Sequence, residues 1–143
     1  MTVETLPPDN FMHFASELVL SPDHLDEYGH LNNSQAMVLL DNERYRIFME
    51  LMHVENLIEL EAKYNFKIFV KKVLSVDYIG EVRPSQSSQI LTKLWRPRQG
   101  EFMWDQTIAT DCLPAITGVF QTWLINPATG KPLSRPPEGI FPL

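Results

Sequence analysis

One stretch of this chain has a long helical periodicity, and short runs typical of β-strands lie on both sides of it. At about 100° per residue, the apolar side chains of the stretch fall on one broad arc, which is typical of a helix with one buried face. These side chains are Met37, Leu40, Ile47, Phe48, Leu51 and Met52. Asn32, Asn33 and Ser34 come just before the arc and are good N-cap residues. The pattern predicts one core-facing helix that begins at these residues and ends near His53.

Two charged residues, Asp41 and Arg44, lie on the apolar arc of this helix. Because they are three residues apart, they can form an ion pair along the helix. Either this pair lies at the edge of the buried face, or the face borders a ligand cavity here instead of a dry core. Glu43, Arg46 and Glu50 fall on the opposite face, where we expect them to be solvated.

Runs rich in β-branched and aromatic residues predict strands around the helix. We expect strands at residues 11–20, 67–79, 89–95, 101–110 and 116–125, a short helix or turn at 55–63, a connection at 80–88, and turns at 96–100 and 126–132. This order predicts an α+β domain in which an antiparallel β-sheet wraps around one long central helix and buries its apolar arc. Phe69, Trp95 and Trp104 are expected on the other sheet face, where a partner chain would cover them.

Length and composition exclude several classes of protein. The 143 residues fit one domain, with residues 1–10 as a loose arm and 132–143 as a proline-rich tail. The net charge of −6 argues against a nucleic-acid binder. No stretch has the ~18 apolar residues of a membrane-spanning helix, and the N-terminus does not resemble a signal peptide. The single cysteine, Cys112, excludes an intrachain disulfide and fits a reducing compartment, so we expect a cytoplasmic protein.

Residues 23–33 concentrate polar chemistry immediately before the predicted helix. The segment holds acids, two histidines, a glycine and two asparagines. At a helix N-terminus the free backbone N–H groups and the macrodipole stabilise negative charge. We therefore interpret this loop as the working site, held in place by the strands and the helix.

Residues 26–33, with the sequence DEYGHLNN, resemble the signature of the hotdog-fold acyl-CoA thioesterases of the 4-hydroxybenzoyl-CoA thioesterase-like group. That signature has an acid three residues before a glycine, then His, an aliphatic residue and two Asn, and it opens the central helix. The Val76-Asp77-Tyr78 strand and the turn at residues 129–132 are also similar to that group. The resemblance spans roughly residues 12–135 and implies a single hotdog domain over residues 1–143.

The resemblance implies a thioesterase that hydrolyses an acyl-CoA or acyl-carrier-protein thioester, with acyl-CoA along the subunit interface of a homodimer or homotetramer. Asp26 matches the catalytic carboxylate, either as nucleophile on the thioester or as general base for water. The backbone N–H groups at the helix start, that of Asn33 among them, resemble the family's oxyanion donors. Gly29 lets the loop turn sharply and the ligand approach closely, while His30 and Asn32 orient the acid or brace the loop.

Coenzyme A carries phosphates, so this acidic chain needs a local group of cations to bind it. The candidates are Lys71, Lys72, Arg96, Arg98, Lys131 and Arg135. No metal site and no cofactor are expected, because the four histidines lack ligand spacing of the His-x-x-x-His kind and thioester hydrolysis needs no metal.

Three positions depart from the family pattern. His24 stands where an acid is frequent, and Ala36 stands where an aromatic residue is frequent, which implies a more open acyl pocket. Asp41 stands where a Glu is frequent, at about the depth where another hotdog branch has its catalytic acid. Asp41 is therefore a rival to Asp26, or a second acid that holds water. A hotdog module that binds acyl thioesters or aromatic ligands without turnover is the alternative function, and a dehydratase that uses His24 or His30 is a third.

Overall fold

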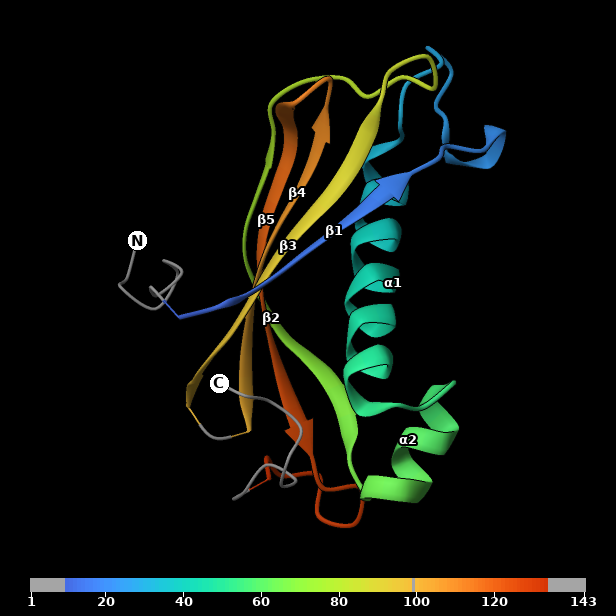
Figure 1. Ribbon diagram of the computed structural model, residues 1–143. Helices are drawn as coiled ribbons and strands as arrows, with labels where there is room; N and C mark the ends of the chain where they lie inside the picture. The colour runs from blue at the N-terminus through green and yellow to red at the C-terminus, as the bar shows by residue number, and fades with distance from the viewer. Residues whose placement is uncertain (1–9, 99, 134–143) are drawn as a thin grey trace.

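The computed structural model describes residues 10–98 and 100–133, apart from the side chain of Arg98. Eight helices and strands follow one another within these residues (Figure 1). They are β1 (Met12–Leu18), a 3₁₀ helix η2 (Pro22–His24), α1 (Asn33–Met52), α2 (Leu57–Tyr64), β2 (Lys67–Tyr78), β3 (Ser88–Arg98), β4 (Glu101–Thr110) and β5 (Leu113–Ile125). Most of the expected N-terminal arm and proline-rich tail lie outside the described residues.

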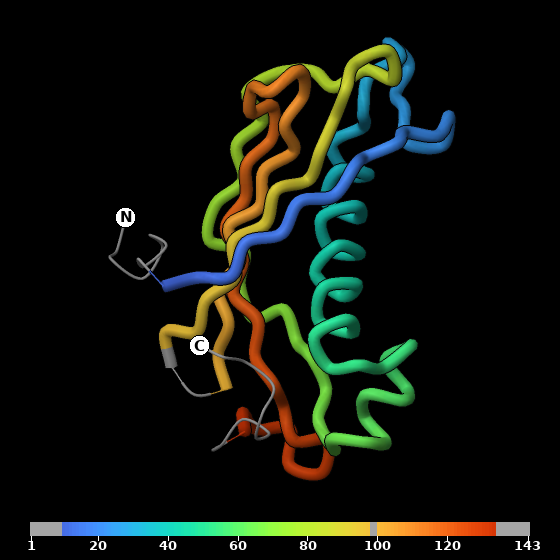
Figure 2. The backbone as a smooth tube through the Cα atoms, viewed as in Figure 1, coloured from blue at the N-terminus to red at the C-terminus, as the bar shows by residue number. Residues whose placement is uncertain are grey.

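The strands form one five-stranded antiparallel sheet in the order β1-β3-β4-β5-β2. The sheet curves along one side of α1, and α2 lies beside the C-terminal end of that helix (Figures 1 and 2). The predicted arrangement, with a sheet wrapped around one long helix, is confirmed. The strands β1 and β2 are the two edges. The register of β2 against β5 shifts twice, between Val70 and Lys72 and again between Val73 and Ser75, and such bulges increase the twist of a strand.

The long helix α1 begins and ends where the sequence predicts. The side chain of Asn32 caps it by accepting hydrogen bonds from the backbone N–H groups of Ser34 and Gln35. The helix ends at His53, whose φ of 55° is left-handed and stops the helical hydrogen bonding. The expected apolar arc is buried or packed against the core, and Ala36, which the arc did not include, is also fully buried.

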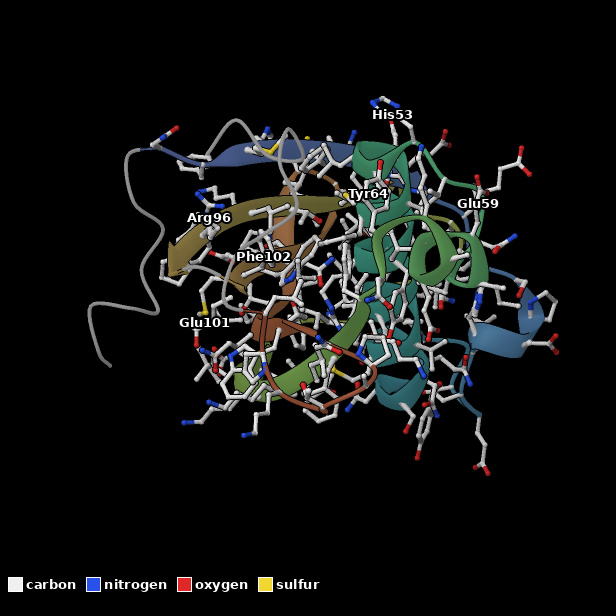
Figure 3. The ribbon with its side chains drawn as sticks, turned by 90° about the horizontal axis from the view of Figure 1, so that it is seen from below. His53, Glu59, Tyr64, Arg96, Glu101 and Phe102 are labelled. Atoms are coloured by element: carbon white, nitrogen blue, oxygen red, sulfur yellow. The ribbon has the colours of Figure 1, made fainter. Side chains whose placement is uncertain are left out.

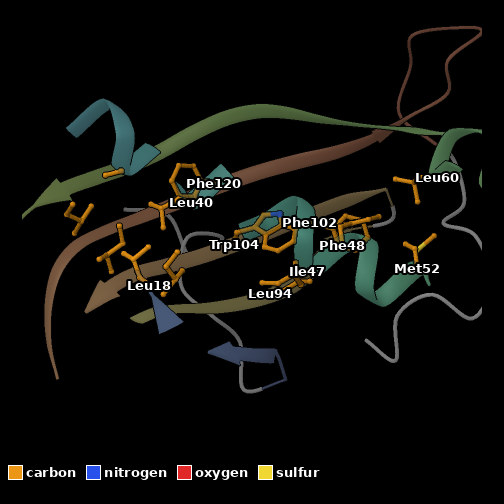
Figure 4. Close-up of a cluster of buried hydrophobic side chains, with 14 of the residues drawn as sticks. Leu18, Leu40, Ile47, Phe48, Met52, Leu60, Leu94, Phe102, Trp104 and Phe120 are labelled. Atoms are coloured by element: carbon orange, nitrogen blue, oxygen red, sulfur yellow. The ribbon is translucent and has the colours of Figure 1, made fainter. Parts of the chain in front are cut away.

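The core lies between α1 and the inner face of the sheet (Figure 4). Phe48 of α1 meets Phe102 of β4 in an edge-to-face contact with ring centroids 5.7 Å apart. Along the second half of β5 buried residues alternate with partly exposed ones, which is the two-residue period of a strand. Burial of this apolar surface is the main force that holds the helix to the sheet.

Two sequence predictions about packing are wrong. Trp104 was expected on the outer face of the sheet, but it is 1% exposed in the core and its indole N–H donates to Thr122 at 2.9 Å. Glu43 was expected in solvent, but it is 6% exposed and accepts hydrogen bonds from Ser16 of β1 and from Arg46. The sheet reaches so far around α1 that β1 covers a helix face which the wheel alone assigns to water.

The turn predicted over residues 96–100 is also too long. The strand β3 continues to Arg98, and its pairing with β4 shifts register between Trp95 and Arg98. Pro97 lies in this irregular part, where the ladder does not need its missing N–H group. The turn itself is short and includes Gly100, whose φ is +72°.

Candidate active site

The loop between β1 and α1 is closed on itself around Asp26. The Oδ1 atom of Asp26 accepts hydrogen bonds from the backbone N–H groups of Tyr28 at 2.9 Å and His30 at 3.1 Å. The backbone N–H of Asp26 donates to the carbonyl of His30 at 2.8 Å. Gly29 has a φ of +78°, which a residue with a Cβ adopts only with strain. The carboxylate of Asp26 therefore has one fixed oxygen, while Oδ2 has no hydrogen-bond partner in the described part of the chain.

The loop is tied to the connection between β2 and β3, which lies beside it at the same end of the molecule (Figure 2). The backbone N–H of Leu31 donates to the carbonyl of Val82 at 2.8 Å, and Leu31 itself is buried. The ring of His30 lies 3.3 Å from Glu81 through Nε2, and it stacks on Tyr28 at 6.4 Å between centroids. Glu81 is not predicted from the sequence, because no local pattern indicates a residue that meets the loop only through the fold.

The start of α1 presents a free donor beside this loop. The side chain of Asn32 is used as the N-cap, so its role is to hold the helix start. The backbone N–H of Asn33 has no acceptor among the described residues, as is usual for the first residue of a helix. Together with the helix dipole, this N–H makes the end of α1 suited to stabilise an oxyanion.

Asp41 lies further along α1, away from the loop at the start of this helix. It is eight residues after Asn33, which is about 12 Å along the axis of an α-helix. Its carboxylate pairs with Arg44 at 2.8 Å, and its side chain is 40% exposed. The predicted ion pair is therefore confirmed. Asp41 and Arg44 also line an open groove of about 360 Å³, together with Met37, Val38, Val70, Val73 and Phe120.

Arg44 is a cation inside the protein, with a side chain only 7% exposed. Its guanidinium donates to Gln106 at 2.7 Å and lies 4.0 Å from the centre of the Phe120 ring. Burial lowers the pKa of Arg44, and the charge of Asp41 opposes this shift. Gln106 in turn donates to the carbonyl of Leu40 at 3.2 Å and to Thr92 at 3.3 Å. Gln106 could have been singled out from the sequence, because it is a polar residue among the apolar residues of the predicted strand.

The expected phosphate-binding cations whose side chains are described lie away from the loop of Asp26 in one chain. Lys71 lies on β2 with its Nζ 3.6 Å from the centre of the Trp123 ring, and Lys72 follows it at this edge of the sheet. Ser88 of β3 pairs with Leu18, close to the loop. Arg96 lies eight residues further along β3, which places it about 26 Å from Ser88 and this end of the sheet. Figure 3 shows Arg96 on the side of the molecule away from the loop. The side chain of Arg98 and all of Arg135 lie outside the described residues.

Two features are absent from the described residues. They hold no group of three or more His, Cys, Asp or Glu side chains placed to bind a metal ion. None of their helices has both the length and the apolar character that crossing a membrane requires.

Neither protein-family models nor curated proteins match this sequence. Solved structures do match the fold. A predicted thioesterase from Bacillus stearothermophilus is 20% identical, covers 88% of this chain and 90% of its own, and has a TM-score of 0.71. A 1,4-dihydroxy-2-naphthoyl-CoA thioesterase from Synechocystis is 16% identical, with coverages of 87% and 90% and a TM-score of 0.70. A thioesterase from Thermus thermophilus, complexed with coenzyme A and Zn, is 18% identical, with coverages of 92% and 95% and a TM-score of 0.69.

These similarities define the architecture of the protein. A five-stranded antiparallel sheet packed on one long helix, shared with solved thioesterases over most of both chains, is the hotdog fold. The fold expected from residues 26–33 is thus confirmed, and the structures that share it include thioesterases of the hotdog class.

Proposed function

We propose that this protein hydrolyses acyl thioesters of coenzyme A or of an acyl-carrier protein. The observation that carries the proposal is the position of Asp26, whose carboxylate is held in a closed loop directly before the unpaired Asn33 N–H. Hydrolysis of a thioester needs an oxygen nucleophile and a donor for the oxyanion, and this end of α1 offers both. The similarity of the fold to solved thioesterases supports the same reaction class.

In the proposed reaction the thioester carbonyl oxygen accepts a hydrogen bond from the N–H of Asn33. The free Oδ2 of Asp26 then acts in one of two ways. As a nucleophile it attacks the carbonyl carbon, the C–S bond breaks, and water later hydrolyses the mixed anhydride. As a general base it takes a proton from water, which attacks the carbon directly. Both routes consume one water and give the free acid and the free thiol.

Asp26 is a better candidate for this acid than Asp41 on geometric grounds. A nucleophile and an oxyanion donor must both lie within about 3 Å of the same carbonyl group. Asp41 is about 12 Å along α1 from Asn33, too far to share a carbonyl with that N–H in one chain. The carboxylate of Asp41 is also engaged by Arg44. Gly29, His30 and Asn32 are assigned to shaping the loop and capping the helix.

We also propose that the complete site needs a second copy of the chain. The edge strand β2 exposes Phe69, which is 51% exposed, and its outer edge pairs with no other strand of the described residues. Because Arg96 is far from Asp26 in one chain, cations of a partner copy are better placed to meet the phosphates of coenzyme A. Lys71, Lys72, Arg96 and Arg98 remain the candidates, in a dimer or a dimer of dimers.

A thiol-release assay over a panel of acyl-CoA thioesters tests the function directly. We expect turnover of at least part of the panel, measured as free thiol that forms in proportion to enzyme concentration. Binding of acyl-CoA without any thiol release would instead identify a hotdog binding module. The absence of both binding and release, for coenzyme A and acyl-carrier-protein thioesters alike, would contradict the proposal.

A further inference from the structure

The groove between α1 and β2 contains a charged pair in otherwise apolar walls. Asp41 and Arg44 contribute the charges, and Met37, Val38, Val70, Val73 and Phe120 contribute the apolar surface. Arginine is rarely buried without a compensating role, because desolvation of its charge is unfavourable. The groove therefore combines apolar walls with two charged side chains that can form hydrogen bonds.

The guanidinium of Arg44 has N–H groups that are not used in hydrogen bonds with the described residues. Two of its five N–H groups are used, one on Gln106 and one on Asp41. Its Nε–H is buried and meets no acceptor in the described part of the chain. A buried unsatisfied donor is unfavourable by itself, so a ligand oxygen that meets the guanidinium from the groove would be stabilising.

The balance of charge decides which oxygen fits. Asp41 lies 2.8 Å from Arg44, so the pair as a whole is neutral. A ligand carboxylate would add an uncompensated negative charge beside Asp41 in a partly desolvated site. A hydroxyl group matches both members of the pair, because its oxygen accepts from the guanidinium while its hydrogen donates to the carboxylate.

The apolar lining of the groove indicates what kind of ligand carries this hydroxyl. Four of the five apolar lining side chains are aliphatic, and the face of the one aromatic ring, Phe120, is already covered by Arg44 at 4.0 Å. No free aromatic face is thus offered here for stacking by a ligand ring. A flexible aliphatic chain suits these walls better than a flat aromatic group.

We propose that the Asp41–Arg44 pair is a specificity site that selects aliphatic acyl groups carrying a hydroxyl remote from the thioester. This inference rests on the proposed thioesterase function. It assigns Arg44 as the donor to the hydroxyl oxygen, Asp41 as the acceptor of its hydrogen, and Gln106 as a positioning residue that holds the guanidinium. It also gives a reason for the buried polar chain from Arg44 through Gln106 to Thr92 in an otherwise apolar core.

The test compares three thioether analogues of medium-chain acyl-CoA, which a hydrolase does not cleave. They are S-octyl-CoA, S-(ω-hydroxyoctyl)-CoA and S-(ω-carboxyheptyl)-CoA, and binding to the full chain is measured by calorimetry. We expect the hydroxyl analogue to bind roughly tenfold to hundredfold more tightly than the methyl analogue, as for hydrogen bonds to charged groups. The carboxylate analogue should bind more weakly than the hydroxyl analogue. Equal binding of all three, or binding of none, would overturn the inference.

Variants then assign the effect to the pair. In Arg44→Met the affinity of the hydroxyl analogue divided by that of the methyl analogue should fall to about one. The control Lys63→Met, on α2, should keep the ratio of the original protein. Asp41→Asn, at a position with a 40% exposed side chain, provides a second variant if Arg44→Met does not fold. This substitution removes the negative charge that compensates the guanidinium. The affinity of the carboxylate analogue divided by that of the methyl analogue should therefore be at least about tenfold higher in Asp41→Asn than in the original protein. The assignment would be contradicted if Arg44→Met still bound the hydroxyl analogue more tightly than the methyl analogue. It would also be contradicted if Asp41→Asn left the ratio of carboxylate to methyl affinity unchanged.

Thioether binding does not depend on turnover, so the two proposals fail separately. A hydroxyl preference without any thiol release would refute the hydrolase and leave the specificity site standing. Thiol release from acyl-CoA without a hydroxyl preference would refute only the specificity site.

Discussion

Asp26 and His30 are joined by two hydrogen bonds across one tight turn. The backbone N–H of Asp26 donates to the carbonyl of His30 at 2.8 Å, and the carboxylate of Asp26 accepts from the backbone N–H of His30 at 3.1 Å. The same residue thus closes the loop with one carboxylate oxygen, and its other oxygen has no hydrogen-bond partner among the described residues. A carboxylate that is fixed in this way loses little further freedom when a substrate arrives, which favours catalysis by positioning.

The cap at Asn32 is expected to stabilise the start of α1. Asn32→Ala removes the acceptor for the N–H groups of Ser34 and Gln35 and should lower the free energy of unfolding by about 1 kcal/mol. Asn32→Asp keeps a capping oxygen and should retain most of the stability. Urea denaturation of both variants measures the difference, and equal loss in the two would show that the cap is not the cause.

The hydrogen bond from Arg44 to Gln106 is expected to matter for stability because both groups are buried. Gln106→Leu leaves an N–H of the guanidinium without its acceptor and should lower the free energy of unfolding by about 1–3 kcal/mol. The same change at the exposed Gln89, on the outer face of β3, serves as the control and should stay within about 0.5 kcal/mol. Comparable effects at the two positions in urea denaturation would contradict this account.

Asp105 is expected to make stability depend on pH. Burial raises the pKa of Asp105, and the facing Lys93 only partly opposes this shift. The folded protein therefore binds the Asp105 proton more tightly than the unfolded chain does. The resulting stabilisation is complete below the ordinary carboxyl pKa of about 3.9 and is lost as pH rises through the folded pKa.

Asp105→Asn removes this dependence, since the amide does not ionise. Thermal melting should show the variant more stable than the original protein at about pH 7 and similar to it at about pH 3. Loss of stability in the variant at the higher pH would mean that attraction to Lys93 outweighs the burial of the carboxylate.

The sequence predicts the order of elements well because each rests on local signals. The N-cap at Asn32 and the apolar arc of α1 define the helix, and runs rich in β-branched and aromatic residues define the strands. The pair of Asp41 and Arg44 follows from their spacing alone. These features depend on neighbours within a few residues, so they can be predicted before the fold is known.

The errors arise where distant segments meet. Glu43 is buried because β1 covers it, and Trp104 faces the helix because the register of β4 places it inward. Glu81 reaches His30 only through the connection after β2. No pattern within a short window encodes these contacts. The roles of Asp26 and Asn33 stay predictions, although the structure places both at the same end of α1.

The rate of thiol release by Asp26→Asn tests whether the Asp26 carboxylate performs the hydrolysis. The substitution keeps an oxygen that can accept the loop hydrogen bonds but removes the carboxylate charge, so circular dichroism and melting temperature should stay close to the original values. We expect the rate to fall by a factor on the order of 10² to 10⁴. The exposed Asp23, in η2 of the same loop, provides the matched control Asp23→Asn, which should keep full activity. Full activity in Asp26→Asn, with its loss in Asp41→Asn instead, would contradict the account.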